Sequence, residues 1–288
     1  MGQIIDTAIE AERFYRNVTS SLRLMPDFLI IGAQKGGTTS LYNYLIEHPN
    51  IATASRKEVH FFDQHFEKGV PWYRSHFPTN AQKYFTQRIR RQAFITGEGS
   101  PEYLFYPHTA EKVAKMLPNV KLIALLRNPV ERAYSQYRHN LHWGHEKLSF
   151  EDAIALEEER TKEGRERAAK EINYHNFSFQ RASYLARGIY IDQLERWMSL
   201  FPREQILIIK SEDFSADPGA IYKKVLTFLD VPLIEPRSLK QGYEQYNKSR
   251  DSVAPPTMDP AIRKRLVSYF EPYNDRLYKF LGYDFGWD

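Results

Sequence analysis

Short apolar runs alternate along the 288-residue chain with longer stretches in which apolar residues recur every three or four positions. The runs are rich in β-branched and aromatic residues and are bounded by Gly, Pro or Asn, which is typical of buried strands. The longer stretches have the spacing of helices that cover a sheet with one face. Strands are predicted at 28–31, 51–54, 93–104, 120–126 and 205–210, and helices from 129 to 137 or beyond and at 189–201, 218–229 and 260–281.

This alternation predicts an α/β fold, a single domain in which helices flank a central parallel sheet. Residues 26–288 are expected to form that domain, and residues 1–25 a helical extension at its N-terminus. The charged segment 144–180 is predicted as helices on a solvated face, with a break near Gly164. Because few apolar residues anchor this segment, we expect it to act as a mobile lid at the ligand entrance.

A glycine-bearing loop follows the first predicted strand. The glycines at 32, 36 and 37 permit backbone conformations that are closed to other residues, and the hydroxyl residues behind them are good helix N-caps. Free N–H groups, the positive end of a helix and a lysine together favour a bound phosphate. The predicted phosphate-binding residues are Lys35, Gly36, Gly37, Thr38, Thr39 and Ser40.

The order of the loop residues distinguishes this loop from two common phosphate loops. Lys35 precedes the glycine pair, whereas the Walker pattern places its lysine after the last glycine. The dinucleotide-binding pattern fails as well, because Gly32 is followed by Ala33, Gln34 and Lys35. An ordinary glycine turn in an α/β unit is the structural alternative.

Composition and charge exclude several classes of protein. The chain has no cysteine, which rules out disulfides, thiolate metal sites and cysteine nucleophiles. Its formal net charge of +4 suits an anionic cosubstrate but does not indicate a nucleic-acid partner. No stretch approaches the roughly 20 apolar residues of a membrane span, and the N-terminus lacks the apolar core of a signal peptide. We therefore expect a cytoplasmic protein without a membrane span.

A carboxylate and an imidazole stand two residues apart at Glu58 and His60, beside the aromatic residues Phe61 and Phe62. In an extended segment their side chains would point to the same side. A group that removes a proton from an alcohol needs such an oriented pair, and aromatic neighbours that exclude water would raise the pKa of Glu58. The structural alternative is a surface ion pair of Glu58 beside a half-buried His60.

A second candidate anion site begins at Arg127, at the carboxyl end of the strand predicted at 120–126. A guanidinium can donate two parallel hydrogen bonds to a phosphate, and Ser135, two turns into the next helix, can donate from the same side. The alternative is an arginine that caps carbonyl groups and a serine exposed on a helix. Two phosphate sites on neighbouring strands would suit a ligand that carries two separate phosphate groups.

Three motifs resemble those of sulfotransferases that use 3'-phosphoadenosine 5'-phosphosulfate (PAPS). Gln-Lys-Gly-Gly-Thr-Thr-Ser resembles the family's 5'-phosphosulfate loop, and Arg-Asn-Pro-x-x-Arg-Ala-x-Ser-x-Tyr resembles its 3'-phosphate site. Lys-Glu-Val-His-Phe-Phe is similar to the segment that carries the catalytic glutamate in the heparan-sulfate branch. The resemblance covers residues 26–284, but Gly99 stands where heparan-modifying members often have an active-site lysine. This departure weakens the expectation of a glycosaminoglycan acceptor.

The resemblance implies transfer of a sulfuryl group from PAPS to an acceptor hydroxyl, with adenosine 3',5'-bisphosphate (PAP) as the product and no metal. The acceptor would be a carbohydrate, a lipid, a small metabolite or a carrier-bound intermediate. Lys35 would stabilise the leaving bisphosphate, Glu58 would be the base, and His60 would orient the acceptor or share the base role. A nucleoside-triphosphate-dependent kinase of related fold and a non-catalytic nucleotide-binding module stay open. The resemblance also implies a loop that folds over the 3'-phosphate, for which a solvated basic loop is the alternative, at Lys248, Ser249 and Arg250.

Overall fold

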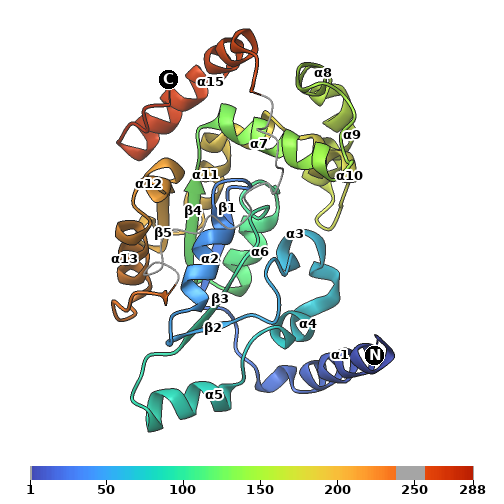
Figure 1. Ribbon diagram of the computed structural model, residues 1–288. Coiled ribbons are helices and arrows are strands. Elements are labelled where there is room, and N and C mark those ends of the chain that lie inside the picture. Colours follow the sequence, from blue (N-terminus) through green and yellow to red (C-terminus); the bar gives the residue numbers. More distant parts are fainter. Residues whose placement is uncertain (1, 238–256, 288) are drawn as a thin grey trace.

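A parallel sheet of five strands forms the centre of the molecule, in the order β2-β3-β1-β4-β5. The computed structural model describes residues 2–237 and 257–287 (Figure 1). Every neighbouring pair of strands is parallel, which confirms the predicted fold class. The strands are β1 (Phe28–Gly32), β2 (Ile51–Thr53), β3 (Ile95–Gly99), β4 (Lys121–Leu126) and β5 (Ile206–Lys210).

The strand order places a topological switch point next to β1. The chain leaves β1 for the outer strand β2 and returns to β3, and then crosses to β4 and β5 on the other side of β1. In open parallel sheets, the loops that follow the strands on either side of such a point diverge and leave room for a ligand. The loops after β1 and β4 are the two in which the sequence predicts phosphate sites.

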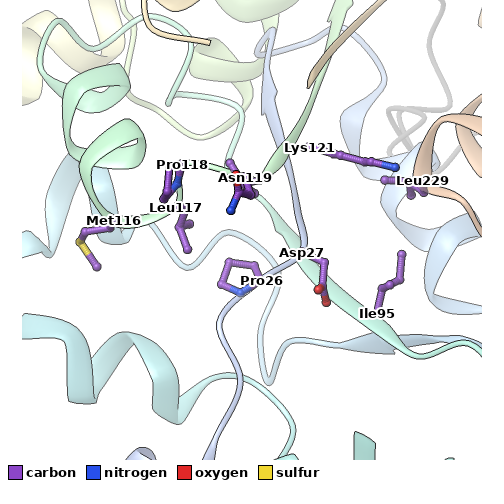
Figure 2. Close-up of a pocket in the computed structure, with 10 residues that line it drawn as sticks. Pro26, Asp27, Ile95, Met116, Leu117, Pro118, Asn119, Lys121 and Leu229 are labelled. Carbon is purple, nitrogen blue, oxygen red and sulfur yellow. The ribbon is translucent and has the colours of Figure 1, made fainter. Parts of the chain in front are cut away.

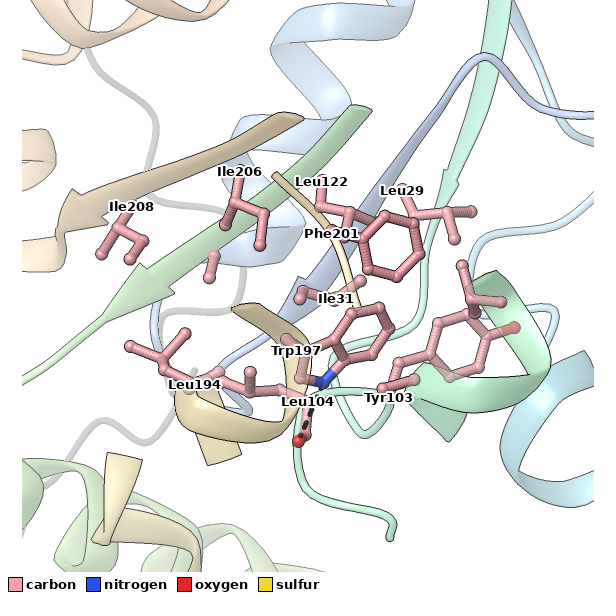
Figure 3. Packing of buried hydrophobic residues seen from close by; sticks show 14 of the residues in the cluster. Leu29, Ile31, Tyr103, Leu104, Leu122, Leu194, Trp197, Phe201, Ile206 and Ile208 are labelled. Carbon is pink, nitrogen blue, oxygen red and sulfur yellow. Dashed lines mark hydrogen bonds between the residues drawn. The ribbon is translucent and has the colours of Figure 1, made fainter. Parts of the chain in front are cut away.

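Side chains alternate along β1 between two hydrophobic clusters, one on each face of the sheet. Leu29 and Ile31 join the cluster that includes Trp197, as Figure 3 shows. Phe28 and Ile30 join the cluster on the other face. The indole N–H of Trp197 donates to the carbonyl oxygen of Leu104 over 3.3 Å, so this large side chain is both packed and hydrogen-bonded. Burial on both faces explains why the predicted strands are continuous apolar runs.

Helices cover both faces of the sheet and extend beyond its carboxyl edge (Figure 1). One face packs on α2 (Thr38–Ile46), α12 (Ser211–Ala216) and α13 (Pro218–Leu229), and the other on α6 (Thr109–Met116) and α11 (Tyr190–Met198). Among the described residues, no helix is long and apolar enough to cross a membrane. In the described part of the chain, the other α-helices are α1 (Gly2–Val18), α3 (Phe61–Gln64), α4 (Gly69–Ser75), α5 (Asn80–Tyr84), α7 (Pro129–His142), α8 (Phe150–Ala155), α9 (Glu157–Lys170), α10 (Phe177–Ala182) and α15 (Pro260–Leu281).

The predicted helix break near Gly164 is wrong, because α9 runs without interruption from Glu157 to Lys170. A Cβ atom at Gly164 would lie 2.7 Å from Cβ of Phe179 and 2.8 Å from Oδ1 of Asn176. The glycine therefore allows the segment that begins α10 to approach α9 closely. It serves packing and does not interrupt the helix.

The charged segment 144–180 is anchored by buried polar side chains that its sequence does not reveal. The carboxylate of Glu157 accepts hydrogen bonds from the backbone N–H groups of Leu185 and Ala186 at 2.6 and 2.9 Å. Glu146 accepts from the hydroxyl of Tyr184 and from Arg160, both at 2.8 Å. These bonds tie α9 and the α7–α8 connection to the chain that follows α10. The expectation of a mobile lid stays a prediction, although its premise of weak anchoring omitted these contacts.

Candidate active site

Hydrogen bonds hold the loop after β1 against the end of β4 and the start of α12. The N–H of Ala33 donates to the carbonyl oxygen of Leu125 over 2.8 Å, and the hydroxyl of Ser211 donates to the carbonyl oxygen of Gly36 over 2.9 Å. A Cβ atom at Gly36 would lie 2.4 Å from that same oxygen of Leu125, so a side chain cannot be accommodated there. Gly37 has φ of 98° and immediately precedes α2. The loop thus presents the first N–H groups of α2, from Thr38 onward, at the carboxyl edge of the sheet.

Lys35 and Arg127 lie together beside this loop, as the sequence predicts for two neighbouring phosphate sites. Nη1 of Arg127 donates to the carbonyl oxygen of Lys35 over 3.4 Å. Burial, and then the charges of Arg127, Arg138 and Arg132, lower the pKa of Lys35 to about 8. So many cations around one loop oppose one another in the absence of an anion, and a bound phosphate would relieve that repulsion.

The other residues predicted to contact the nucleotide are Ser135 and a basic loop that precedes the C-terminal helix in the sequence. Ser135 is half-buried on α7, whose start is fixed by Asn128: its side chain accepts hydrogen bonds from the N–H groups of Val130 and Glu131. Pro129 occupies the first turn, as predicted. The three residues of the predicted basic loop, Lys248, Ser249 and Arg250, lie outside the described residues.

Glu58 and His60 are brought together, but not by the extended conformation that the sequence analysis assumed. Both residues adopt left-handed backbone conformations, with φ of 59° at Glu58 and 55° at His60. Nε2 of His60 lies 3.6 Å from Oε2 of Glu58, and its Nδ1 lies 2.8 Å from Oδ2 of Asp63. Two such backbone conformations in non-glycine residues are strained, and they persist only where surrounding contacts fix them.

Those contacts come from one buried carboxylate, Glu98, at the end of β3. Glu98 is fully buried and accepts a hydrogen bond from the N–H of Val59 at 3.2 Å. It also accepts from the hydroxyls of Ser100 at 2.7 Å and Tyr103 at 2.9 Å. The same two hydroxyls accept from the backbone, Ser100 from the N–H of His60 at 3.1 Å and Tyr103 from the N–H of Phe61 at 2.9 Å. Three consecutive N–H groups are therefore held by the side chains of a distant strand and turn.

The charges around Glu58 lower its pKa, contrary to the expectation from its aromatic neighbours. Burial alone would raise the pKa of Glu58, but the neighbouring His60 and Lys57 outweigh it and lower the pKa to about 2. Burial likewise opposes the charged form of His60, but Asp63 and Glu58 raise its pKa to about 11. At neutral pH the pair is thus a carboxylate beside an imidazolium. His60 in this state donates hydrogen bonds and has no free lone pair with which to accept a proton.

Lys57 connects this pair to the phosphate loop. Its ammonium lies 2.6 Å from the hydroxyl oxygen of Thr39, in the first turn of α2, and 2.6 Å from Oε1 of Glu58. The candidate base is therefore separated from the candidate phosphate site by a single side chain. The sequence analysis did not identify Lys57, although its position directly before Glu58 could have suggested it.

Asp63 and Glu102 also belong to this neighbourhood and were missed from the sequence. With His60 they place atoms of metal-ligand type within 4.8 Å of one another. Hydrogen bonds account for this arrangement: Asp63 pairs with His60, and Glu102 accepts from side-chain amides, among them both contacts from Gln180 at 3.0 and 3.1 Å. The three-residue spacing of His60 and Asp63 could have suggested their pairing, whereas nothing in the sequence signals that Glu102 lies beside them.

A cavity of about 420 Å³ lies at the opposite edge of the sheet (Figure 2). It is lined by residues at the amino ends of the strands, including Asp27 before β1, Ile95 at the start of β3 and Lys121 at the start of β4. Its position separates it from the loop of Lys35 and from Glu58. The cavity is therefore distinct from the candidate active site.

A parallel sheet with a glycine loop and a helix N-terminus after its first strand defines an α/β protein of the phosphate-loop type. Residues 25–268 match the model of the family described as Sulfotransferase domain. The chain belongs to this sulfotransferase family, and it is a sulfotransferase by this membership. The predictions of family, fold class and enzyme class are confirmed.

Named relatives and a solved structure agree with this membership. The chain is 30% identical to the membrane-associated sulfotransferase kil1 of Dictyostelium discoideum, over 94% of this chain and 68% of kil1. It is 28% identical to human heparan sulfate glucosamine 3-O-sulfotransferase 3B1, over 93% of this chain and 66% of that protein. It thus spans about two thirds of the length of these relatives. A crystal structure of a sulfotransferase from Alicyclobacillus acidocaldarius is 31% identical, with a TM-score of 0.67 over 92% of this chain and 99% of the other.

Proposed function

We propose that this enzyme transfers the sulfuryl group of PAPS to a hydroxyl group of its acceptor. The observation that carries the proposal is the bridge of Lys57, which joins the phosphate loop to Glu58 through two contacts of 2.6 Å. A direct transfer needs the cosubstrate and the acceptor's base within such a distance of each other. Family membership supports PAPS as the cosubstrate, because PAPS is the donor used by this family.

The loop residues and Arg127 would hold the two phosphates of PAPS. N–H groups at the start of α2 and the hydroxyls of Thr38, Thr39 and Ser40 are suited to the 5'-phosphosulfate. Arg127, directly after β4, and Ser135, on α7, are suited to the 3'-phosphate. Lys35 would stabilise the charge that develops on the bridging oxygen while the S–O bond breaks. The proposed set also retains Lys248, Ser249 and Arg250 over the 3'-phosphate.

Glu58 would receive the proton of the acceptor hydroxyl, whose oxygen forms the new bond to sulfur as PAP leaves. A carboxylate with a pKa near 2 is a weak base, so proton transfer would follow rather than precede S–O cleavage. His60, held as an imidazolium by Asp63, would donate a hydrogen bond that orients Glu58 or the acceptor. The protonated state of His60 favours Glu58 over His60 as the base.

The acceptor we propose first is a carbohydrate hydroxyl. Support comes from the relatives named heparan sulfate glucosamine 3-O-sulfotransferases. A lipid, a small metabolite and a carrier-bound intermediate are the alternatives that the acceptor panel must include. A cytoplasmic location also stays a prediction, and the relative kil1 is named as membrane-associated.

Purified protein incubated with sulfur-labelled PAPS, and in parallel with phosphorus-labelled ATP, tests the proposal on such a panel. We expect label transfer from PAPS alone; transfer from ATP would indicate a kinase, and binding without transfer a nucleotide-binding module. Glu58→Gln should keep PAP affinity and lower turnover by about 10²–10⁴-fold. If Glu58→Gln retains normal turnover while folded His60→Ala loses it, the base is misassigned although the transfer reaction stands.

A further inference from the structure

Lys57 makes two contacts that belong to different halves of the proposed reaction. Its ammonium donates to Thr39, whose hydroxyl is a proposed ligand of the 5'-phosphosulfate, and to Glu58, the proposed base. The side chain is 25% exposed, so its charge is only partly screened by water. An ammonium has three donors on a flexible stem, and it can exchange one partner for another without a change of the backbone.

A phosphosulfate bound at the loop would compete for this ammonium. Its oxygens would approach the hydroxyl of Thr39, which lies one hydrogen bond from Nζ of Lys57. The sulfuryl group must then pass from the loop toward the acceptor beside Glu58. Lys57 therefore stands beside the path of the group that moves.

We propose that Lys57 couples the base to the cosubstrate: it restrains Glu58 while the loop is empty and moves to the sulfuryl oxygens when PAPS binds. This inference rests on the proposed function and assigns a second cation to the transferring group. No bond is formed to Lys57, and no proton passes to or from it. Its departure frees one carboxylate oxygen of Glu58 for the acceptor hydroxyl.

The charged groups around Glu58 allow this exchange to be measured. Lys57 and His60 face Glu58 from its own segment, and Lys35 from the loop; behind His60 stand three further carboxylates, Asp63, Glu98 and Glu102. Of the cations, Lys57 is bonded both to Glu58 and to the loop hydroxyl of Thr39. If the ammonium leaves Glu58, the pKa of that carboxyl should rise from about 2.

The experiment is a carbon-13 NMR titration of the Glu58 carboxyl, assigned with Glu58→Gln, in the free protein and with PAPS in the absence of acceptor. In the wild type we expect a low pKa that rises when PAPS binds. In Lys57→Met, which keeps the length of the stem without its charge, the pKa of Glu58 should already be higher by about 1–3 in the free protein. Its further rise with PAPS should be smaller than in the wild type. Lys57→Arg, which keeps the charge, should retain the low value in the free protein.

Turnover supplies the second readout. Loss of a cation beside the sulfuryl group during its transfer should lower kcat of Lys57→Met by about 10²–10³-fold, with partial recovery in Lys57→Arg. An equal rise of the Glu58 pKa with PAPS in wild type and Lys57→Met, or an unchanged kcat, overturns the role of Lys57 while PAPS-dependent transfer stands. If the wild type neither binds PAP nor transfers sulfuryl, the proposed function fails and this inference falls with it.

Discussion

Two buried tyrosines give a matched test of how the candidate base is positioned. The hydroxyls of Tyr73 and Tyr103 both donate to Oε1 of Glu98, at 2.8 and 2.9 Å, and both rings are fully buried. Only Tyr103, within the described contacts, also accepts from the N–H of Phe61, directly after His60. Tyr73→Phe and Tyr103→Phe thus each remove one hydroxyl that donates a hydrogen bond to Glu98. They differ in what happens to the segment that carries the candidate base.

The contacts give the size of the expected difference. Tyr73→Phe removes one hydrogen bond to a charged group, which costs about 1.5–3 kcal/mol of unfolding free energy. Tyr103→Phe should cost the same and a further 1–3 kcal/mol or so, because the buried N–H of Phe61 loses its acceptor. Tyr103→Phe should also lower kcat, since Phe61 N–H helps to fix the left-handed backbone at His60. Tyr73→Phe should leave kcat much closer to that of the wild type.

Urea unfolding followed by circular dichroism gives the two free energies, and sulfuryl transfer from labelled PAPS gives kcat. PAP affinity serves as the control for folding in both variants, since neither tyrosine contacts the loop of Lys35. Equal losses of stability and of kcat in the two variants would refute the assignment of Tyr103 as a positioning residue. The buried carboxylate of Glu98 would then act on stability alone.

Three further predictions concern the nucleotide site and the helix packing. Arg127→Ala should weaken PAP binding far more than binding of adenosine 5'-phosphate, by about 1.5–3 kcal/mol for the lost charge-assisted bond; equal losses in calorimetry would exclude a 3'-phosphate contact. Because Lys35 has a pKa of about 8 and binds an anion only when protonated, PAP affinity should fall as pH rises from 7 to 9.5, and Lys35→Arg should abolish that slope in the same titration. Gly164→Ala should destabilise by about 1–3 kcal/mol in urea unfolding, despite alanine's better helix propensity, because its Cβ would lie 2.7 Å from a neighbouring side chain. Gly219→Ala, where the nearest atom would be 3.5 Å away, is the control and should be neutral or stabilising.

The central strands and the phosphate loop could be predicted because their signals are local. Strand β4 is an apolar run buried on both faces. Helix α7 begins at an Asn-Pro pair, in which the side chain of the asparagine caps the helix and the proline occupies its first turn. The loop before α2 is defined by consecutive glycines and hydroxyl residues. Each of these features depends on neighbours in the sequence, so periodicity and capping rules suffice to locate it. The resemblance of the chain to the sulfotransferase family could likewise be found from local motifs.

The geometry of the candidate base could not be predicted, because residues distant in sequence impose it. An acidic residue such as Glu98 is expected at the surface, and its full burial depends on donors that come from three separate segments. Those donors fix Glu58 and His60 in left-handed conformations, whereas the sequence favoured an extended segment. The pairing with Asp63 then reverses the expected pKa of Glu58, because it keeps His60 charged.

The alternation of β3 also clarifies the departure at Gly99. A Cβ atom at Gly99 would lie 3.5 Å from Cβ of Ile30 and 3.7 Å from the ring of Tyr42, in the cluster on the face opposite to the first core. Glu98, one residue earlier, projects to the other side and bonds to Val59 next to the candidate base. The side chain of a lysine at position 99 would therefore leave the backbone on the side away from the hydrogen bonds of Glu98. The absence of that lysine leaves these hydrogen bonds intact. We expect the absence of a lysine at position 99 to affect which acceptor binds, and not the proposed roles of Lys35 and Glu58.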